Sequence, residues 1–315
     1  KYRKKLHKLS KQIQKGIALA FNKFDEYQFA KYNRSTMVSL KDALFLTHPK
    51  AESDAQQNLF NKIVSDTLEV PYTWEVELSA LGRKQYANDF RKMQAVRAKW
   101  EELIDSGRLG YMAMMRNLRN ILAAKVSMTS LEIVGLRLAV PQAVRRSKQL
   151  PFRFLSAYRE LEDLGYEGRA YLMDKLEAAA EISAENIKGF NLQTRVLLAA
   201  DVSGSMYKTI SPRSKVRCFD IGLVLSMLMR NKSDNVETGI FGSTWKRVSL
   251  PKRNILANAL QLNSIEGSVG YATNGYKVID DLIDRRAVKD KVMIFTDLQM
   301  WDSHNGGGGL KSSWM

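Results

Sequence analysis

Three oxygen-bearing side chains at alternate positions, Asp201, Ser203 and Ser205, follow directly on an apolar run that ends at Ala200. An uninterrupted apolar run is typical of a parallel strand that is buried on both faces of its sheet. In an open α/β sheet the ligand site lies beyond the carboxyl ends of the strands. The sequence therefore places one carboxylate and two hydroxyls where such a site forms.

Two segments further along the chain bring more oxygen ligands to the same kind of position. The run Lys291-Val-Met-Ile-Phe-Thr ends in Asp297, and Thr273 precedes a helical stretch over residues 276–286. Carboxylate and hydroxyl oxygens without sulfur or imidazole suit a hard cation, Mg²⁺ or Mn²⁺. We predict one divalent-cation site formed by Asp201, Ser203, Ser205, Thr273 and Asp297. Its open position can accept the carboxylate of an acidic protein ligand.

This arrangement resembles the metal-ion-dependent adhesion site of the von Willebrand factor A domain, and all five ligand positions match. Asp-x-Ser-x-Ser alone is a weak pattern, because Asp and Ser are ordinary turn and helix-cap residues. Its position after an apolar strand, with Thr273 and Asp297 in the right order downstream, makes it specific. The alternative is a site that keeps the motif and holds no metal.

The elements that must position these residues change in type along the chain. Helical periodicity dominates residues 1–189, and strands alternate with helices in residues 190–315, which predicts an all-α domain followed by a doubly wound α/β domain. The expected helices span residues 39–47, 54–68, 83–105, 130–139, 151–163 and 168–180. The expected strands span residues 194–200, 236–242, 245–250 and 291–296. The pattern over Tyr111–Leu122 predicts one more helix.

Positive charge is the second informative feature. The chain carries 49 Lys and Arg against 33 Asp and Glu, a formal net charge of +16. Such a balance favours a phosphate backbone as partner, and a membrane surface is the alternative. Two clusters stand out, and their guanidinium, amide and ammonium groups suit phosphates and base edges. They contain Arg116, Arg119 and Asn120, and Arg145, Arg146, Lys148 and Arg153, with Tyr111 and Tyr158 as candidates for base stacking.

Composition excludes several classes of protein. A single cysteine, Cys218, excludes a disulfide framework and favours a reducing, cytoplasmic setting. No apolar stretch approaches the length of a membrane span. The sequence has no phosphate-binding Gly-x-x-x-x-Gly-Lys loop and no His-Glu-x-x-His motif. Because a two-metal nuclease needs more carboxylates than Asp201 and Asp297, we predict that the protein is not an enzyme.

Several strings in the helical part resemble the TROVE module of the Ro autoantigen family, chiefly Arg-Asn-Leu-Arg-Asn at 116–120 and Gln-Leu-Pro-Phe-Arg-Phe at 149–154. A helical domain followed by an A-type domain is also the order found in that family. The resemblance implies a ring of HEAT-like helical hairpins, a bacterial member and a monomer within a ribonucleoprotein. From the resemblance we expect that N-terminal helices before Lys1 are missing, and that the A-type domain stops after Asp297 and the glycine run, short of its last strands and helices.

The resemblance also implies a function. Family members bind small noncoding Y RNA and the single-stranded 3′ ends of misfolded RNAs, and bacterial members work with an exoribonuclease in RNA quality control. The expectation is therefore an RNA-binding scaffold. The competing hypothesis is a metal-dependent adaptor that binds a partner such as an ATPase through the A-type domain, with incidental affinity for RNA.

Overall fold

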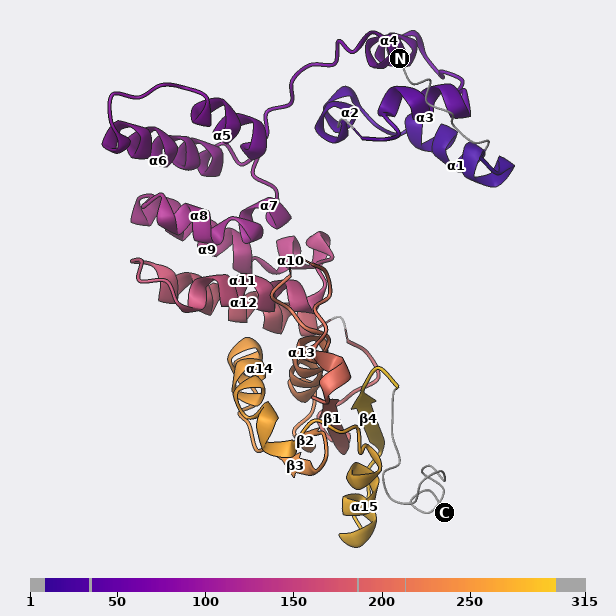
Figure 1. Ribbon diagram of the computed structural model, residues 1–315, viewed down its shortest axis with the longest axis vertical. Coiled ribbons are helices and arrows are strands. Elements are labelled where there is room, and N and C mark those ends of the chain that lie inside the picture. The colour runs from indigo at the N-terminus through magenta and orange to yellow at the C-terminus, as the bar shows by residue number, and fades with distance from the viewer. Residues whose placement is uncertain (1–8, 34–35, 186, 213, 299–315) are drawn as a thin grey trace. The chain divides into compact units, whose positions relative to one another are not determined.

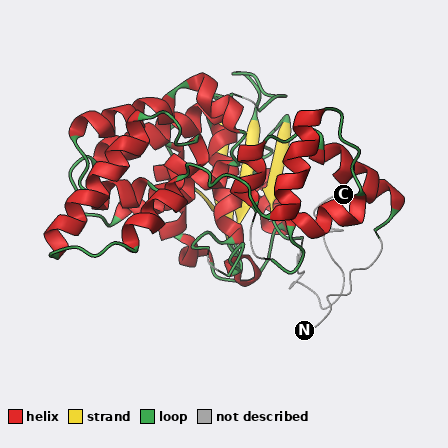
Figure 2. Ribbon diagram, turned by 90° about the horizontal axis from the view of Figure 1, so that it is seen from above, coloured by secondary structure: helices red, strands yellow, loops and turns green. Residues whose placement is uncertain are grey.

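A computed structural model describes residues 9–33, 36–185, 187–212 and 214–298, and the chain divides into two compact units at residues 85 and 86. The first unit is helical. The second begins with helices and ends with a sheet whose strands lie among helices (Figures 1 and 2).

The first unit is a small helical bundle whose helices all begin at a capping side chain. Ser10, Asp25, Ser39, Ser53 and Thr73 each accept a hydrogen bond from the backbone N–H three residues later, which satisfies an otherwise unpaired donor. A core of Phe21, Phe29, Phe60 and Ile63 holds the helices within residues 11–65 together. The helices are α1 (Lys11–Phe21), α2 (Glu26–Tyr32), α3 (Leu40–Thr47), α4 (Asp54–Ser65) and α5 (Trp74–Gly82).

The helical part of the second unit is a stack of helices around fully buried side chains such as Trp100, Leu138 and Phe154. In this stack α12 packs against α9 and α11, and α6 packs against α9. The helices are α6 (Asp89–Asp105), α7 (Tyr111–Arg116), α8 (Leu118–Ala123), α9 (Met128–Ala139), α10 (Pro141–Ser147), α11 (Pro151–Glu162) and α12 (Arg169–Ala184).

A four-stranded sheet follows, in the order β3-β2-β1-β4. β1 pairs in parallel with β2 and β4, and β3 is antiparallel to β2. Every residue of β1 is buried, as the continuous apolar run predicts. The strands are β1 (Val196–Asp201), β2 (Val236–Phe241), β3 (Trp245–Arg247) and β4 (Lys291–Phe295). The helices among them are η1 (Gly204–Tyr207), α13 (Cys218–Arg230), α14 (Ile255–Ser264), η2 (Glu266–Val269) and α15 (Tyr276–Asp284).

Helices cover both faces of this sheet. On one face Val278 of α15 packs against Leu197, Ala199 and Phe241. On the other, α13 packs on β1 and β4, and a side chain at Gly222 would approach the Cβ of Phe295 in β4 to 3.1 Å. The predicted fold class, a helical region followed by a doubly wound α/β domain, is confirmed, whereas closure of the helices into a ring stays a prediction.

The helical stack and the α/β domain share a polar contact inside the second unit. Arg159 of α11 donates two hydrogen bonds to the buried carboxylate of Asp220 on α13, at 2.5 and 2.6 Å. Glu177 of α12 accepts from the backbone N–H groups of Leu256 and Ala257 and so caps the N-terminus of α14. These contacts fix α11 and α12 against the domain that carries the predicted metal site.

Some local expectations were wrong. The helix expected over Tyr111–Leu122 is two short helices, because Asn117 leaves helical geometry and forms the end of α7 and the start of α8. Helix α10 was not expected, although Pro141 at its first position is a common helix start. The strand expected at 245–250 ends at Arg247, and the helix expected from residue 83 begins at Asp89 after its cap, Asn88.

Candidate functional site

The carboxylate of Asp201 is the centre of the predicted metal site. It is the last residue of β1 and has no exposed surface. One carboxylate oxygen accepts from the backbone N–H of Ser203 at 2.8 Å, and the other accepts from the hydroxyl of Thr296 at 2.6 Å. The hydroxyl oxygens of Ser203 and Ser205 lie 3.4 Å apart in the same turn. The structure therefore brings Asp201, Ser203 and Ser205 together.

The donor set fits a hard cation. Within the described part of the chain, no lysine or arginine forms an ion pair with Asp201, although its carboxylate is fully buried. Asp220, the other fully buried aspartate there, is neutralised by Arg159. A buried carboxylate is normally paired with a cation, and a metal ion can take that role. Since no group of three His, Cys, Asp or Glu side chains gathers among the described residues, hydroxyls would supply most of the ligands.

Thr273 and Asp297 reach the same edge of the sheet by different routes. Thr273 is buried in a loop that is tied to the metal-site turn, because the N–H of Gly204 donates to the carbonyl of Tyr271 at 2.9 Å. Asp297 is exposed and lies two residues beyond the end of β4, beside Thr296. The role of all five residues as metal ligands stays a prediction.

Glycine is required where the Thr273 loop crosses the end of β2. A Cβ on Gly242 would lie 1.9 Å from the carbonyl oxygen of Gly270, far inside contact distance. The carbonyl of Gly242 also accepts from the N–H of Asn274 at 2.9 Å. This close approach of two backbones sets the position of Thr273.

Two features of the site were missed by sequence reasoning. Thr296 holds a carboxylate oxygen of Asp201, and its signal was its place in the same apolar run as Asp297. The second is an aromatic and basic rim, in which the ring of Tyr207 contacts Tyr271 and Phe219 and the guanidinium of Arg217 lies 4.9 Å from the Tyr207 ring centre. Residue types alone gave no indication of this rim.

The first basic cluster lies where α7 meets α8. Arg116, Arg119 and Asn120 are all exposed, whereas Met115 and Leu118 are buried, as the helical spacing predicted. Arg119 forms an ion pair with Glu160 at 3.2 Å. The amide of Asn120 donates to the side-chain oxygen of Asn117 at 2.8 Å.

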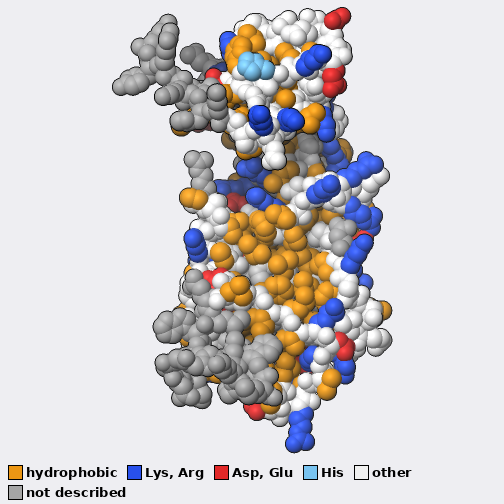
Figure 3. Space-filling model, turned by 90° about the vertical axis from the view of Figure 1, so that its right-hand side faces the viewer, with side chains coloured by type: hydrophobic (Ala, Val, Ile, Leu, Met, Phe, Trp, Pro, Cys, Tyr) orange, Lys and Arg blue, Asp and Glu red, His pale blue; other side chains and the backbone are white. Residues whose placement is uncertain are grey.

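The second basic cluster covers α10 and the start of α11. Arg145, Arg146, Lys148 and Arg153 are exposed, and Arg145 pairs with Glu185. Lys148 ends α10 in a left-handed conformation, with φ of 48°. Because α10 packs against α7, and α11 packs against α7 and α8, the two clusters lie on neighbouring helices. On the face of the second unit that Figure 3 shows, Lys and Arg side chains gather along one margin of a hydrophobic area.

The two tyrosines expected to stack on bases are not free rings. The hydroxyl of Tyr111 donates to the carbonyl of Leu138 at 2.9 Å, and burial raises its pKa well above the usual value. Tyr158 is half-buried, and burial together with the charge of Glu177 raises its pKa. Both rings are therefore packed within the helical stack.

Comparison with known proteins agrees with the helical architecture. Residues 66–208 match the model of the TROVE domain, a segment that contains both basic clusters. Telomerase protein component 1 of Mus musculus is 43% identical over 94 residues, and that of Rattus norvegicus is 42% identical over 97 residues. These segments are 30% and 31% of this chain, and the chain spans 3% of the length of either relative.

A solved structure matches most of the chain. The crystal structure of the Ro (RSR) protein of Deinococcus radiodurans superimposes on 95% of this chain with a TM-score of 0.57 and 21% sequence identity, and the match covers 66% of that protein. At this identity the likeness shows the fold. The fold of this chain, helices followed by an α/β domain, is therefore similar to that of the Deinococcus radiodurans protein. Residues 66–208 of this chain are thus similar to the TROVE domain.

Proposed function

We propose that this protein binds RNA through its TROVE helices and works in RNA quality control. The ligands we propose are Y-like noncoding RNA and the single-stranded 3′ ends of structured or misfolded RNAs, with an exoribonuclease as partner. The observation that carries the proposal is the set of exposed basic side chains on the neighbouring helices α7, α8, α10 and α11, inside the segment that matches the TROVE domain. The net charge of +16 supports it.

The ion pairs divide the predicted contacts into two kinds. Among the described residues, Arg116, Arg146, Lys148 and Arg153 form no ion pair, so their charges are available to phosphates. Arg119 and Arg145 are paired with glutamates across exposed contacts. Such surface pairs contribute only about 0–1 kcal/mol, so a phosphate can replace the glutamate at little cost. We expect the four unpaired cations to dominate the initial encounter with RNA.

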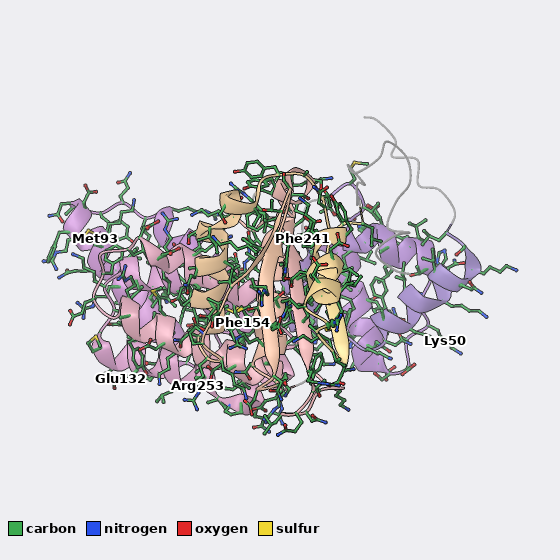
Figure 4. All side chains as sticks on the ribbon, turned by 90° about the horizontal axis from the view of Figure 1, so that it is seen from below. Lys50, Met93, Glu132, Phe154, Phe241 and Arg253 are labelled. Carbon is green, nitrogen blue, oxygen red and sulfur yellow. The ribbon has the colours of Figure 1, made fainter. Side chains whose placement is uncertain are left out.

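Charge reversal tests this proposal. Replacing Arg116 and Arg146 by Glu removes two unpaired cations and adds repulsion, so RNA affinity should fall more than tenfold at moderate salt. Arg253→Glu combined with Arg286→Glu makes the same change of charge at two exposed residues of the α/β domain and should leave affinity nearly unchanged (Arg253 is labelled in Figure 4). Fluorescence anisotropy with a labelled RNA gives both values. Equal losses in the two proteins would show that binding follows net charge and has no site.

A metal-dependent adaptor is the second candidate, and the buried carboxylate of Asp201 without an ion-pair partner favours it. In that case a Mg²⁺ or Mn²⁺ ion held at this edge would accept a carboxylate from an acidic protein ligand. Asp201→Ala should then abolish capture of a protein partner and leave RNA affinity intact. The RNA proposal predicts instead that Arg116→Glu lowers RNA affinity and leaves capture of a protein partner intact.

With two carboxylates at the candidate metal site, we also propose that the protein is not itself a nuclease. Among the described residues, no helix is both long and apolar enough to cross a membrane.

A further inference from the structure

A pocket of about 610 Å³ opens between the helices of the second unit, on residues that neither basic cluster includes. It is bounded by α6, by the connection between α8 and α9, and by the connection between α11 and α12, which lie at one end of the helical stack (Figure 1). Its floor is apolar, since Leu122, Val126 and Leu131 are buried. Pockets of this size hold small molecules or single nucleotides.

The rim of the pocket combines cations with groups that stack. Lys125 is exposed and forms no ion pair among the described residues, and Arg97 of α6, which is paired with Glu101, also lines the pocket. The ring of Tyr166 is 37% exposed and the side chain of Met128 is 44% exposed, so both can contact a ligand. Glu167, also exposed, is the acidic residue at the rim.

The walls are held in place by contacts behind the rim. One carboxylate oxygen of Glu101 accepts both from Arg97 at 3.1 Å and from the backbone N–H of Ser127 at 2.8 Å, which ties α6 to the start of α9. Gly168 has φ of 82°, and a Cβ there would lie 2.5 Å from the side chain of Leu131. The connection that carries Tyr166 is therefore pressed against α9. A pocket whose walls are fixed before binding loses little entropy when a ligand enters.

We propose that this pocket binds one unpaired nucleotide of the RNA. The base would lie on the apolar floor beside Tyr166 and Met128, and its phosphate would contact Lys125 and Arg97. Unpaired bases are recognised by stacking on aromatic rings together with backbone contacts to cations, which is the combination present here. The unpaired charge of Lys125 favours a nucleotide over a neutral apolar side chain from a protein, and a phosphate can share Arg97 with Glu101. The inference rests on the proposed binding of RNA, and it adds this pocket as a second place where the protein contacts the RNA, besides the two basic clusters.

The test uses the full chain and a single-stranded RNA that carries 4-thiouridine, with anisotropy for affinity and photo-crosslinking with mass spectrometry for position. Tyr166→Ala should weaken binding about tenfold, because loss of one stacked base costs about 1–3 kcal/mol. Tyr166→Phe keeps the ring and should bind within twofold of the original protein. Lys125→Ala should reduce the slope of log affinity against log salt by about 0.7, the contribution of one phosphate on a single strand. Arg253→Ala is the matched control and should leave the slope unchanged.

The outcomes separate the two proposals. Crosslinks at Tyr166 or Met128, together with the predicted losses, support the nucleotide pocket. If the original protein binds RNA but Tyr166→Ala and Lys125→Ala bind equally well, the pocket assignment is overturned and RNA binding stands. If the original protein does not bind RNA, both proposals fail. Comparison of thermal unfolding checks that the variants are folded, which is expected because Tyr166 and Lys125 lie at the surface.

Discussion

The contact between Arg159 and Asp220 gives the sharpest prediction about the fold. Asp220 has no exposed surface and accepts three hydrogen bonds, two from Arg159 and one from the backbone N–H of Arg217 at 2.7 Å. Arg159→Met keeps much of the side-chain volume and leaves a buried charge without its counter-ion. Breaking one partner of a buried pair costs about 3–5 kcal/mol, because the remaining carboxylate cannot recover its hydration.

Urea unfolding followed by circular dichroism measures this loss. With a slope of about 2 kcal/mol per molar, the midpoint should fall by roughly 2 M. Adding Asp220→Asn to Arg159→Met removes the orphan charge and should restore part of the stability. The exposed pair between Arg195 and Asp290 is the control, and its Arg195→Met variant should unfold at nearly the same midpoint as the original protein. An unchanged midpoint for Arg159→Met, or a double variant as unstable as the single one, would refute the reasoning.

Three further predictions concern the metal site, a close backbone approach and a helix cap. Thr296→Val removes the hydroxyl that donates a hydrogen bond to Asp201. Mn²⁺ affinity measured by calorimetry should fall about tenfold, which is the usual effect of losing a group that orients a metal ligand. Unchanged affinity would contradict this prediction. Gly242→Ala places a Cβ 1.9 Å from a carbonyl oxygen and should lower the free energy of unfolding in urea by at least about 1–3 kcal/mol. The control is Gly16→Ala on α1, where the new Cβ has open space and should not destabilise the protein. Equal unfolding midpoints for the two variants would contradict this prediction. Burial raises the pKa of Glu177 in the folded state, so protonation of this carboxyl favours folding. The stability of the original protein relative to Glu177→Gln should therefore fall as the pH rises from below 4.5 through the raised pKa. A stability difference that stays constant with pH would argue against this prediction.

Much of the α/β domain was predictable because its signals are local. β1 is buried at every position, and its apolar run can be read without knowledge of the rest of the chain. The carboxyl ends of parallel strands share one edge, so Asp201 and Asp297 were expected at the same place. Thr296 could not be singled out, because its hydrogen bond to Asp201 joins residues 95 positions apart.

The helical region was less predictable for the same physical reason. Charge clusters and helical spacing placed Arg116 and Arg119 on an exposed face. The break at Asn117 depends on a side-chain bond from its amide to the carbonyl of Ala113 at 2.8 Å, a local competition that periodicity does not reveal. The pocket beside Tyr166 combines side chains from three separate segments, and only the packing of α6, α9 and the loop before α12 brings them together.

The most direct test of the central claim is RNA binding itself. A structured RNA with a single-stranded 3′ tail should be compared with the same RNA made blunt-ended, across a salt series with and without Mg²⁺. We predict tail-dependent binding whose log affinity falls steeply with log salt, by about 0.7–0.9 for each phosphate contacted. Weak binding that ignores the tail would contradict the account and leave the metal-dependent adaptor as the better explanation.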